Sequence, residues 1–201
     1  MKVTKTKIKD LIILETQIYP DKRGWFTESY NQQAFDQILS QLNQPKARFI
    51  QDNLSFSHKN VLRGLHYQTK PYSQAKLIQV VQGSVWDVAV DLRQDSSTFG
   101  QWFGIEISAQ NHKQLWIPAG FAHGFLTLQD NTLFTYKTTN FYAKEHEYSI
   151  LWNDPDLNIK WPIAPNTEII QSVKDQHAPS LKKSLLISNF IQTSDITSIC
   201  H

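Results

Sequence analysis

The sequence predicts an all-β fold, a closed antiparallel barrel or jelly roll with a few short flanking helices. Many short segments alternate apolar and polar residues, which is typical of strands. Turn signals such as "QGS" and "QDN" separate these segments at close spacing, which favours antiparallel pairing over βαβ units. Aromatic residues make up 12% of the chain and also favour a β-rich core.

The length of 201 residues suits one ordinary domain. We expect a single domain over residues 1–201, with a core over about residues 12–179 and a C-terminal tail over about residues 180–201. The sequence contains no internal repeat and no linker that would divide it.

Eight segments show the alternation of a strand and are bounded by turn residues. In chain order they are Ile12–Ile18, Trp25–Ser29, Phe49–Ser57, Val61–Gln68, Trp102–Ile107, Gln114–Ile117, Gly124–Leu128 and Leu133–Thr138. Between the fourth and the fifth, "KLIQVV", "QGS" and "VWDVAVDL" predict two more strands paired as a β-hairpin. In the second of these strands one face carries Trp86, Val88, Val90 and Leu92, and the other carries Asp87, Ala89 and Asp91.

One helix is clear in "NQQAFDQILSQLNQP", where Asn31 suits the N-cap and Pro45 ends the helix. Its apolar face consists of Phe35, Ile38, Leu39 and Leu42. In the tail, "SLKKSLLISNFI" predicts a short helix, and we expect the last ten residues to be loose.

Composition argues against several classes of partner. The net charge is only +2 and the basic residues are scattered, which does not favour nucleic-acid binding. No segment is apolar enough to cross a bilayer, and the first apolar run, Leu11–Leu14, is too short for a signal peptide. A single cysteine, Cys200, excludes a disulfide within the chain, so we expect the reducing cytoplasm.

The stretch "VLRGLHYQ" places two polar side chains in an apolar strand. Arg63 and His66 have opposite parity, so a regular strand would point them to opposite faces unless Gly64 introduces a bulge or kink. Read alone, this is a surface arginine beside a packed histidine. In "IPAGFAHGF", His123 follows a tight turn and is equally compatible with a turn histidine and with a functional one.

Taken together, the motifs resemble those of a known family. They are "RGWFTESYN", "QDNLSFS", "VLRGLHYQ", "AKLIQVVQGSVWDVAVDLR", "TFGQW", "QLWIPAGFAHGF", "YKTTNFY", "LWNDP" and "SVKDQHAP". From about Ile12 to about Pro179 the chain resembles the RmlC-like cupins, the dTDP-4-dehydrorhamnose 3,5-epimerases. The resemblance implies a cupin double-stranded β-helix, usually dimeric. It also implies inversion of C3 and C5 of a 4-keto-6-deoxyhexose linked to dTDP, a step in dTDP-L-rhamnose biosynthesis.

The resemblance assigns four catalytic roles. Removing a proton next to a ketone needs a base, a partner for the enolate oxygen and an acid across the ring. His66 matches the base, because histidine accepts protons near neutral pH, and Asp175 matches the carboxylate that orients it. Lys76 matches the cation beside the C4 oxygen, and Tyr136 the acid on the opposite face. Without the resemblance, Lys76 reads as a surface lysine and Tyr136 as a packed tyrosine.

The family positions also predict substrate contacts. They are Arg23, Phe26, Glu28, Gln51, Asp52, Asn53, Arg63, His123, Tyr142, Glu147 and Lys174. Arg23 and Arg63 match residues that grip the pyrophosphate, for which guanidinium groups are well suited. Phe26 and Tyr142 could sandwich the thymine ring, one of them reaching over from a partner subunit of a homodimer. The loop "TKPYSQ" and the tail carry no assigned role.

We expect no metal and no cofactor. Cupins that bind a metal use histidines spaced by one residue, but here Gln68 lies two positions after His66. The corresponding position further along the barrel holds Lys76, whose ammonium group would repel a divalent cation. The alternatives are a 3-epimerase or ketoisomerase on a related nucleotide-linked ketosugar, a non-catalytic sugar-nucleotide-binding cupin, and a metal-dependent cupin oxygenase.

Overall fold

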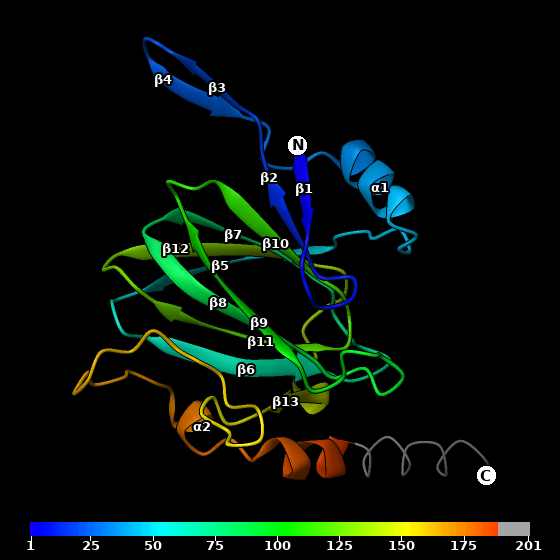
Figure 1. Ribbon diagram of the computed structural model, residues 1–201, viewed down its shortest axis with the longest axis vertical. Coiled ribbons are helices and arrows are strands. Elements are labelled where there is room, and N and C mark those ends of the chain that lie inside the picture. The colour runs from blue at the N-terminus through cyan, green and yellow to red at the C-terminus, as the bar shows by residue number, and fades with distance from the viewer. Residues whose placement is uncertain (189–201) are drawn as a thin grey trace.

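Two β-sheets pack face to face in the computed structural model, which describes residues 1–188 (Figure 1). The larger sheet contains, in spatial order, β1 (Lys2–Lys5), β2 (Ile12–Glu15), β10 (Lys113–Ile117), β7 (Lys76–Gln82), β12 (Thr132–Thr138) and β5 (Gln51–Ser57). The smaller contains β13 (Glu147–Ser149), β6 (Leu62–Gln68), β11 (Phe121–Thr127), β8 (Ser84–Asp91) and β9 (Trp102–Ser108). All these pairings are antiparallel, which confirms the predicted all-β jelly roll.

A separate hairpin and a few short helices complete the described chain. The hairpin, β3 (Ile18–Asp21) and β4 (Gly24–Thr27), projects away from the two sheets (Figure 1). The helices are α1 (Gln32–Gln41), the 3₁₀ turn η1 (Lys144–His146), α2 (Val173–Gln176) and residues 181–188. The predicted tail helix is therefore confirmed for residues 181–188. Its remainder, the loose last ten residues and Cys200 lie outside the described residues.

The predicted hairpin of "KLIQVV" and "VWDVAVDL" is wrong. Both strands form, but β7 lies in the larger sheet and β8 in the smaller one. At the turn between them Gly83 has a φ of 78°, and an added Cβ would lie 2.4 Å from Thr132 Oγ1. The edges of β7 pair with β10 and β12, and those of β8 with β9 and β11, so this turn carries the chain between sheets.

The other predicted strands form, with shifted ends. The segment predicted over Ile12–Ile18 is two strands, because the chain leaves its pairing with β10 after Glu15 and enters the projecting hairpin. The short strands β1 and β13 were not predicted. The helix is confirmed: Asn31 Oδ1 accepts a hydrogen bond from the Ala34 amide at 3.1 Å, and Phe35, Ile38 and Leu39 are buried.

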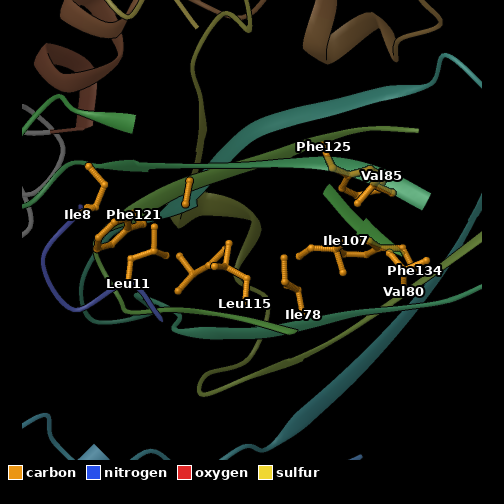
Figure 2. Packing of buried hydrophobic residues seen from close by; sticks show 12 residues of the cluster. Ile8, Leu11, Ile78, Val80, Val85, Ile107, Leu115, Phe121, Phe125 and Phe134 are labelled. Atoms are coloured by element: carbon orange, nitrogen blue, oxygen red, sulfur yellow. The ribbon is translucent and has the colours of Figure 1, made fainter. Parts of the chain in front are cut away.

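One part of the core between the sheets is an apolar cluster to which both sheets contribute (Figure 2). Ile78 and Val80 of β7 meet Val85 of β8 and Phe125 of β11 there. The opposite face of β8 is also covered, because Val88 and its neighbours pack against Ile150, Leu157, Ile159 and Leu181. The predicted division of β8 into two faces is therefore confirmed, and this strand is buried on both.

Candidate active site

Two adjoining cavities are lined by strands of both sheets. The smaller, about 260 Å³, is lined by Gln51, Asn53, Tyr142 and Glu147 among others. The larger, about 460 Å³, is lined by Ser55, Arg63, His123, Gln171 and Asp175 among others. His66, Lys76 and Tyr136 line both cavities. The three side chains expected to do chemistry therefore stand together at the junction of the two cavities.

Gly64 explains how Arg63 and His66 reach the same cavity. Its φ is 109°, and the register between β6 and β11 shifts at this point. An added Cβ would lie 2.6 Å from the His123 carbonyl oxygen, so only glycine fits between the strands. The bulge that the sequence predicts is confirmed, and it changes the parity between the two side chains.

His66 is paired with a buried carboxylate. Its Nε2 lies 2.5 Å from Asp175 Oδ1, and Asp175 is 3% exposed. The Ser172 hydroxyl accepts from the Asp175 amide and caps α2, which fixes the carboxylate. Burial on its own raises the pKa of Asp175, but the hydrogen bond and charge of His66 lower it together with hydrogen bonds from Ser172 and the Gly64 backbone, and the net effect is a lowered pKa. Asp175 is therefore an ionised acceptor that leaves Nδ1 of His66 free to take a proton.

Lys76 and Tyr136 face each other across the junction. Lys76 Nζ lies 5.9 Å from the centre of the Tyr136 ring. Burial lowers the pKa of Lys76 to about 8, although the charges of Glu147 and Asp87 act in the opposite direction. Burial, followed by the charge of Glu147, raises the pKa of Tyr136. At neutral pH the pair therefore consists of a cation and a protonated phenol.

His123 forms a second histidine–carboxylate pair. Its Nε2 lies 2.9 Å from Oδ2 of Asp87, which is 0% exposed. Burial lowers the pKa of His123 and raises that of Asp87. Sequence reasoning missed Asp87 as part of the site, although a carboxylate on the same strand face as Val85 and Ala89, which point into the core, was a usable signal.

Glu147 links the site to two predicted contacts. Its Oε2 accepts from the Tyr142 hydroxyl at 3.0 Å and from the Lys174 ammonium group. Burial on its own raises the pKa of Glu147, but the ion pair with Lys174, the charge of His66 and the Tyr142 hydrogen bond together lower it. Lys174 lines neither cavity and reaches the site through this ion pair.

The inward row of β5 is polar throughout. Gln51 Nε2 donates to Asn53 Oδ1 at 2.9 Å, and Ser57 Oγ accepts from Arg63 Nε and Nη2, both at 3.1 Å. These bonds orient the Arg63 guanidinium at the wall of the larger cavity. Ser55, the remaining residue of the row, was missed by sequence reasoning, although its parity with Asn53 could have indicated it.

Besides Lys174, four predicted contacts line neither cavity. Arg23, Phe26 and Glu28 belong to the projecting hairpin and the segment after it, where Arg23 pairs with Asp21 at 2.5 Å. Glu28 accepts from Asn31 Nδ2 at 3.2 Å. Asp52 lies on the opposite face of β5 and pairs with Lys137 at 2.9 Å. The structure does not bring these side chains to the cavities of their own chain.

Residues 1–188 contain no group of three or more His, Cys, Asp or Glu side chains placed to share a metal ion. Within the same residues, every helix is too short or too polar to cross a membrane.

Comparison with known proteins agrees with this geometry. A family model described as dTDP-4-dehydrorhamnose 3,5-epimerase matches residues 5–183. The protein of that name from Salmonella typhimurium is 51% identical over 186 residues, which are 92% of this chain and 98% of the relative. The structure of dTDP-6-deoxy-D-glucose-3,5-epimerase from Legionella pneumophila, in complex with dTDP-4-keto-L-rhamnose, is 45% identical with a TM-score of 0.84. The match covers 90% of this chain and 93% of that chain.

A related activity is also represented among similar structures. A 3′-monoepimerase from Streptomyces bikiniensis, solved in complex with dTDP-quinovose, is 32% identical with a TM-score of 0.82. The match covers 90% of this chain and 89% of that chain.

Proposed function

This chain belongs to the family of dTDP-4-dehydrorhamnose 3,5-epimerases, and on that premise we propose that His66, Lys76 and Tyr136 carry out its reaction. It is an isomerase of the cupin fold that inverts C3 and C5 of dTDP-4-dehydro-6-deoxy-D-glucose. The product is dTDP-4-dehydro-L-rhamnose, an intermediate of dTDP-L-rhamnose biosynthesis. The observation that carries the proposal is the junction where the His66–Asp175 pair, Lys76 and Tyr136 meet.

Proton removal is the task of His66. Nδ1 accepts the proton from C3 or C5, and the electron pair of the C–H bond moves to form the enolate at C4. Asp175 stabilises the resulting imidazolium through Nε2–H. The Lys76 ammonium stabilises the negative enolate oxygen, an interaction that is stronger in a partly buried site than in water.

Proton return is the task of Tyr136. Its raised pKa keeps the hydroxyl protonated, so it can donate to the carbon from the face opposite His66. After one inversion His66 holds one proton more and Tyr136 one fewer than at the start, and exchange with solvent restores both. Because C3 and C5 both neighbour the C4 ketone, the same groups serve both carbons.

The charges around the cavities suit the nucleotide part. Arg63 is held by Ser57 at the wall of the larger cavity and is the cation for the pyrophosphate. Tyr142, at the smaller cavity, offers a ring to stack against thymine, and Gln51 and Asn53 offer polar contacts beside it. Because Arg63 binds the pyrophosphate and His66 removes the proton, a substitution of His66 should affect the chemistry without affecting nucleotide binding.

We propose that the protein is a homodimer in which the projecting hairpin completes the partner's site. The hairpin that carries Arg23 and Phe26 projects away from the two sheets (Figure 1), and Tyr19, Trp25 and Phe26 are 57%, 59% and 66% exposed. The edge strand β5 also exposes Leu54 and Phe56. Exposed aromatic residues on a projecting element favour a protein partner over solvent.

Complementation tests this arrangement. We expect Arg23→Ala and His66→Ala to be inactive separately and to regain activity when refolded together, because one mixed site then contains both native residues. Sedimentation should show a dimer for each variant. A fully active monomer, or a mixture without recovered activity, would contradict the role of the hairpin in the partner's site.

The absence of a metal requirement and the cytoplasmic location are also proposals. The first rests on the ammonium group of Lys76 at the position where a cupin ligand is expected, and the second on the lone cysteine. Prolonged chelation should leave turnover unchanged. Activity that is lost on chelation and restored by a divalent ion would contradict the first proposal.

Proton exchange tests the chemistry. In deuterated water, NMR should show solvent deuterium entering dTDP-4-dehydro-6-deoxy-D-glucose at both C3 and C5. His66→Ala should abolish this exchange while dTDP binding, measured by calorimetry, stays within about twofold, a change of under about 0.5 kcal/mol. Exchange at C3 alone would instead identify a 3-epimerase, and collapse of dTDP binding would make His66 a structural residue.

A further inference from the structure

Two polar groups in the larger cavity have no partner. Ser55 Oγ and Gln171 Nε2 are buried, and neither hydrogen-bonds to any group within residues 1–188. Both residues line the cavity that also holds Arg63, His66 and Lys76. A buried donor without a partner is costly, so it is retained where a ligand or a function requires it.

The lack of a hydrogen-bond partner at Ser55 is not a general feature of the inward side chains of β5. Gln51, Asn53 and Ser57, the other members of the inward row of β5, all have hydrogen-bond partners. Ser55 lies opposite Phe134 on β12, and both residues line the cavity. Along β5, Ser55 stands between Asn53 and Ser57 in the inward row.

Gln171 approaches from the smaller sheet, because its neighbour Ile170 pairs with Val61 beside β6. It lies between Ile170, whose backbone is held by Asn60 and Leu62, and Ser172, which caps α2. Its backbone is therefore fixed beside the helix that carries Asp175, and Gln171 lines the cavity.

We propose that Ser55 Oγ and Gln171 Nε2 form a subsite for the hydroxyl groups of the hexose. The proposal rests on the proposed function, in which His66 acts on the sugar in this cavity. A 4-keto-6-deoxyhexose linked through C1 keeps only two hydroxyl groups, on C2 and C3. Neutral hydroxyl and amide groups match them, whereas Arg63 matches the charged pyrophosphate. Holding both hydroxyls fixes the ring so that C3 and C5 face His66.

The test compares sugar-dependent and nucleotide-dependent binding. For Ser55→Ala and Gln171→Leu we expect kcat/KM for the ketosugar nucleotide to fall about 3- to 10-fold each, the value of one neutral hydrogen bond. The Kd of dTDP, which lacks the hexose, should stay unchanged. The melting temperature of the unliganded Ser55→Ala protein should not decrease, because the hydroxyl that is removed has no partner.

Ser149→Ala is the matched control. Ser149 Oγ is also buried without a hydrogen-bond partner, but Ser149 lines neither cavity. We expect its kinetics to equal those of the wild type. Three results would overturn the subsite. In Ser55→Ala they are an unchanged kcat/KM, or a loss of dTDP affinity equal to the loss of kcat/KM. The third is a loss of kcat/KM in Ser149→Ala equal to that in Ser55→Ala. Failure of the wild type to exchange C3 and C5 protons would instead overturn the proposed function.

Discussion

At the scale of single residues, Gly64 decides the geometry of the site. The bulge it permits places Arg63, which suits the charged nucleotide, and His66, which suits the ketosugar, on one cavity wall. Any side chain at this position would collide with the His123 carbonyl and with Gly124. A regular strand would place these two side chains on opposite faces, but the bulge brings them to one cavity within four residues of sequence, Arg63–His66.

Tyr136→Phe should separate exchange from inversion. The ring volume is kept, so His66 still removes protons, but the opposite face loses its proton donor. We expect inverted product to form about 10²- to 10⁴-fold more slowly, the usual contribution of a general acid, while deuterium still enters the substrate. The measurement is NMR of label incorporation beside product stereochemistry.

Tyr30→Phe is the control for this substitution. The Tyr30 hydroxyl donates to Gln32 outside both cavities, so the loss of this hydroxyl should not affect inversion. Wild-type inversion at both carbons in Tyr136→Phe would return Tyr136 to a packing role.

The charge of Lys76 predicts an alkaline limit to activity. The ammonium form is the active one and is present below its pKa, which burial lowers from 10.5 to about 8. We therefore expect kcat/KM to fall as pH rises through about 8. Because the Asp87 carboxylate raises this pKa, Asp87→Asn should move the fall to lower pH. If kcat/KM of Asp87→Asn falls at the same pH as that of the wild type, the charge of Asp87 does not act on Lys76.

At the scale of elements, a buried carboxylate ties the end of β8 to the turn between β1 and β2. Asp91 is 0% exposed and accepts from Arg93, Ser96 and Thr98, while Arg93 also pairs with Asp10 at 2.7 Å. Burial alone would raise the pKa of Asp91, but these hydrogen bonds together lower it. The network is remote from both described cavities of the site.

Asp91→Asn should destabilise the fold by about 3 kcal/mol, because it leaves Arg93 without its buried partner. Since the folded pKa lies below the usual value of 3.8, the contribution is present above that pH and is lost as pH falls through the folded pKa. Urea unfolding of the wild type and of Asp91→Asn at pH 7 and pH 3 measures the loss of stability and its dependence on pH. The exposed Asp95→Asn is the control, and equal effects of the two substitutions would contradict a buried network.

At the scale of the whole molecule, the two sheets share one interior. The apolar cluster fills one part of it, and the polar cavities occupy the part beside β6 and β5. The segment after β13 closes the outer face of the smaller sheet, where Leu157 and Leu181 pack against Val88. Because each sheet depends on the other for its buried face, we expect a single domain.

Unfolding in urea should therefore be cooperative. Tryptophan fluorescence and far-UV circular dichroism should give coincident transitions, and for a dimer the midpoint should rise with protein concentration. Two separated transitions at one concentration would show that the sheets unfold independently, contrary to a single domain.

The sequence by itself determined the features that depend on local pattern. The periodicity of Phe35, Ile38 and Leu39 predicted α1, and the alternation in β8 predicted its two faces, because side-chain direction follows directly from backbone geometry. The motifs also indicated the family, and with it His66 and Asp175 as partners across 109 positions.

Only the tertiary structure decided which strands pair. Adjacent strands joined by "QGS" favoured a hairpin, but β7 and β8 lie in different sheets. Their apolar faces pack against each other in the core, which requires one strand in each sheet. The same long-range packing decided that Asp87 meets His123 and that Ser55 stands without a hydrogen-bond partner. Such contacts join residues far apart in the chain, so no local pattern of apolar and polar residues encodes them.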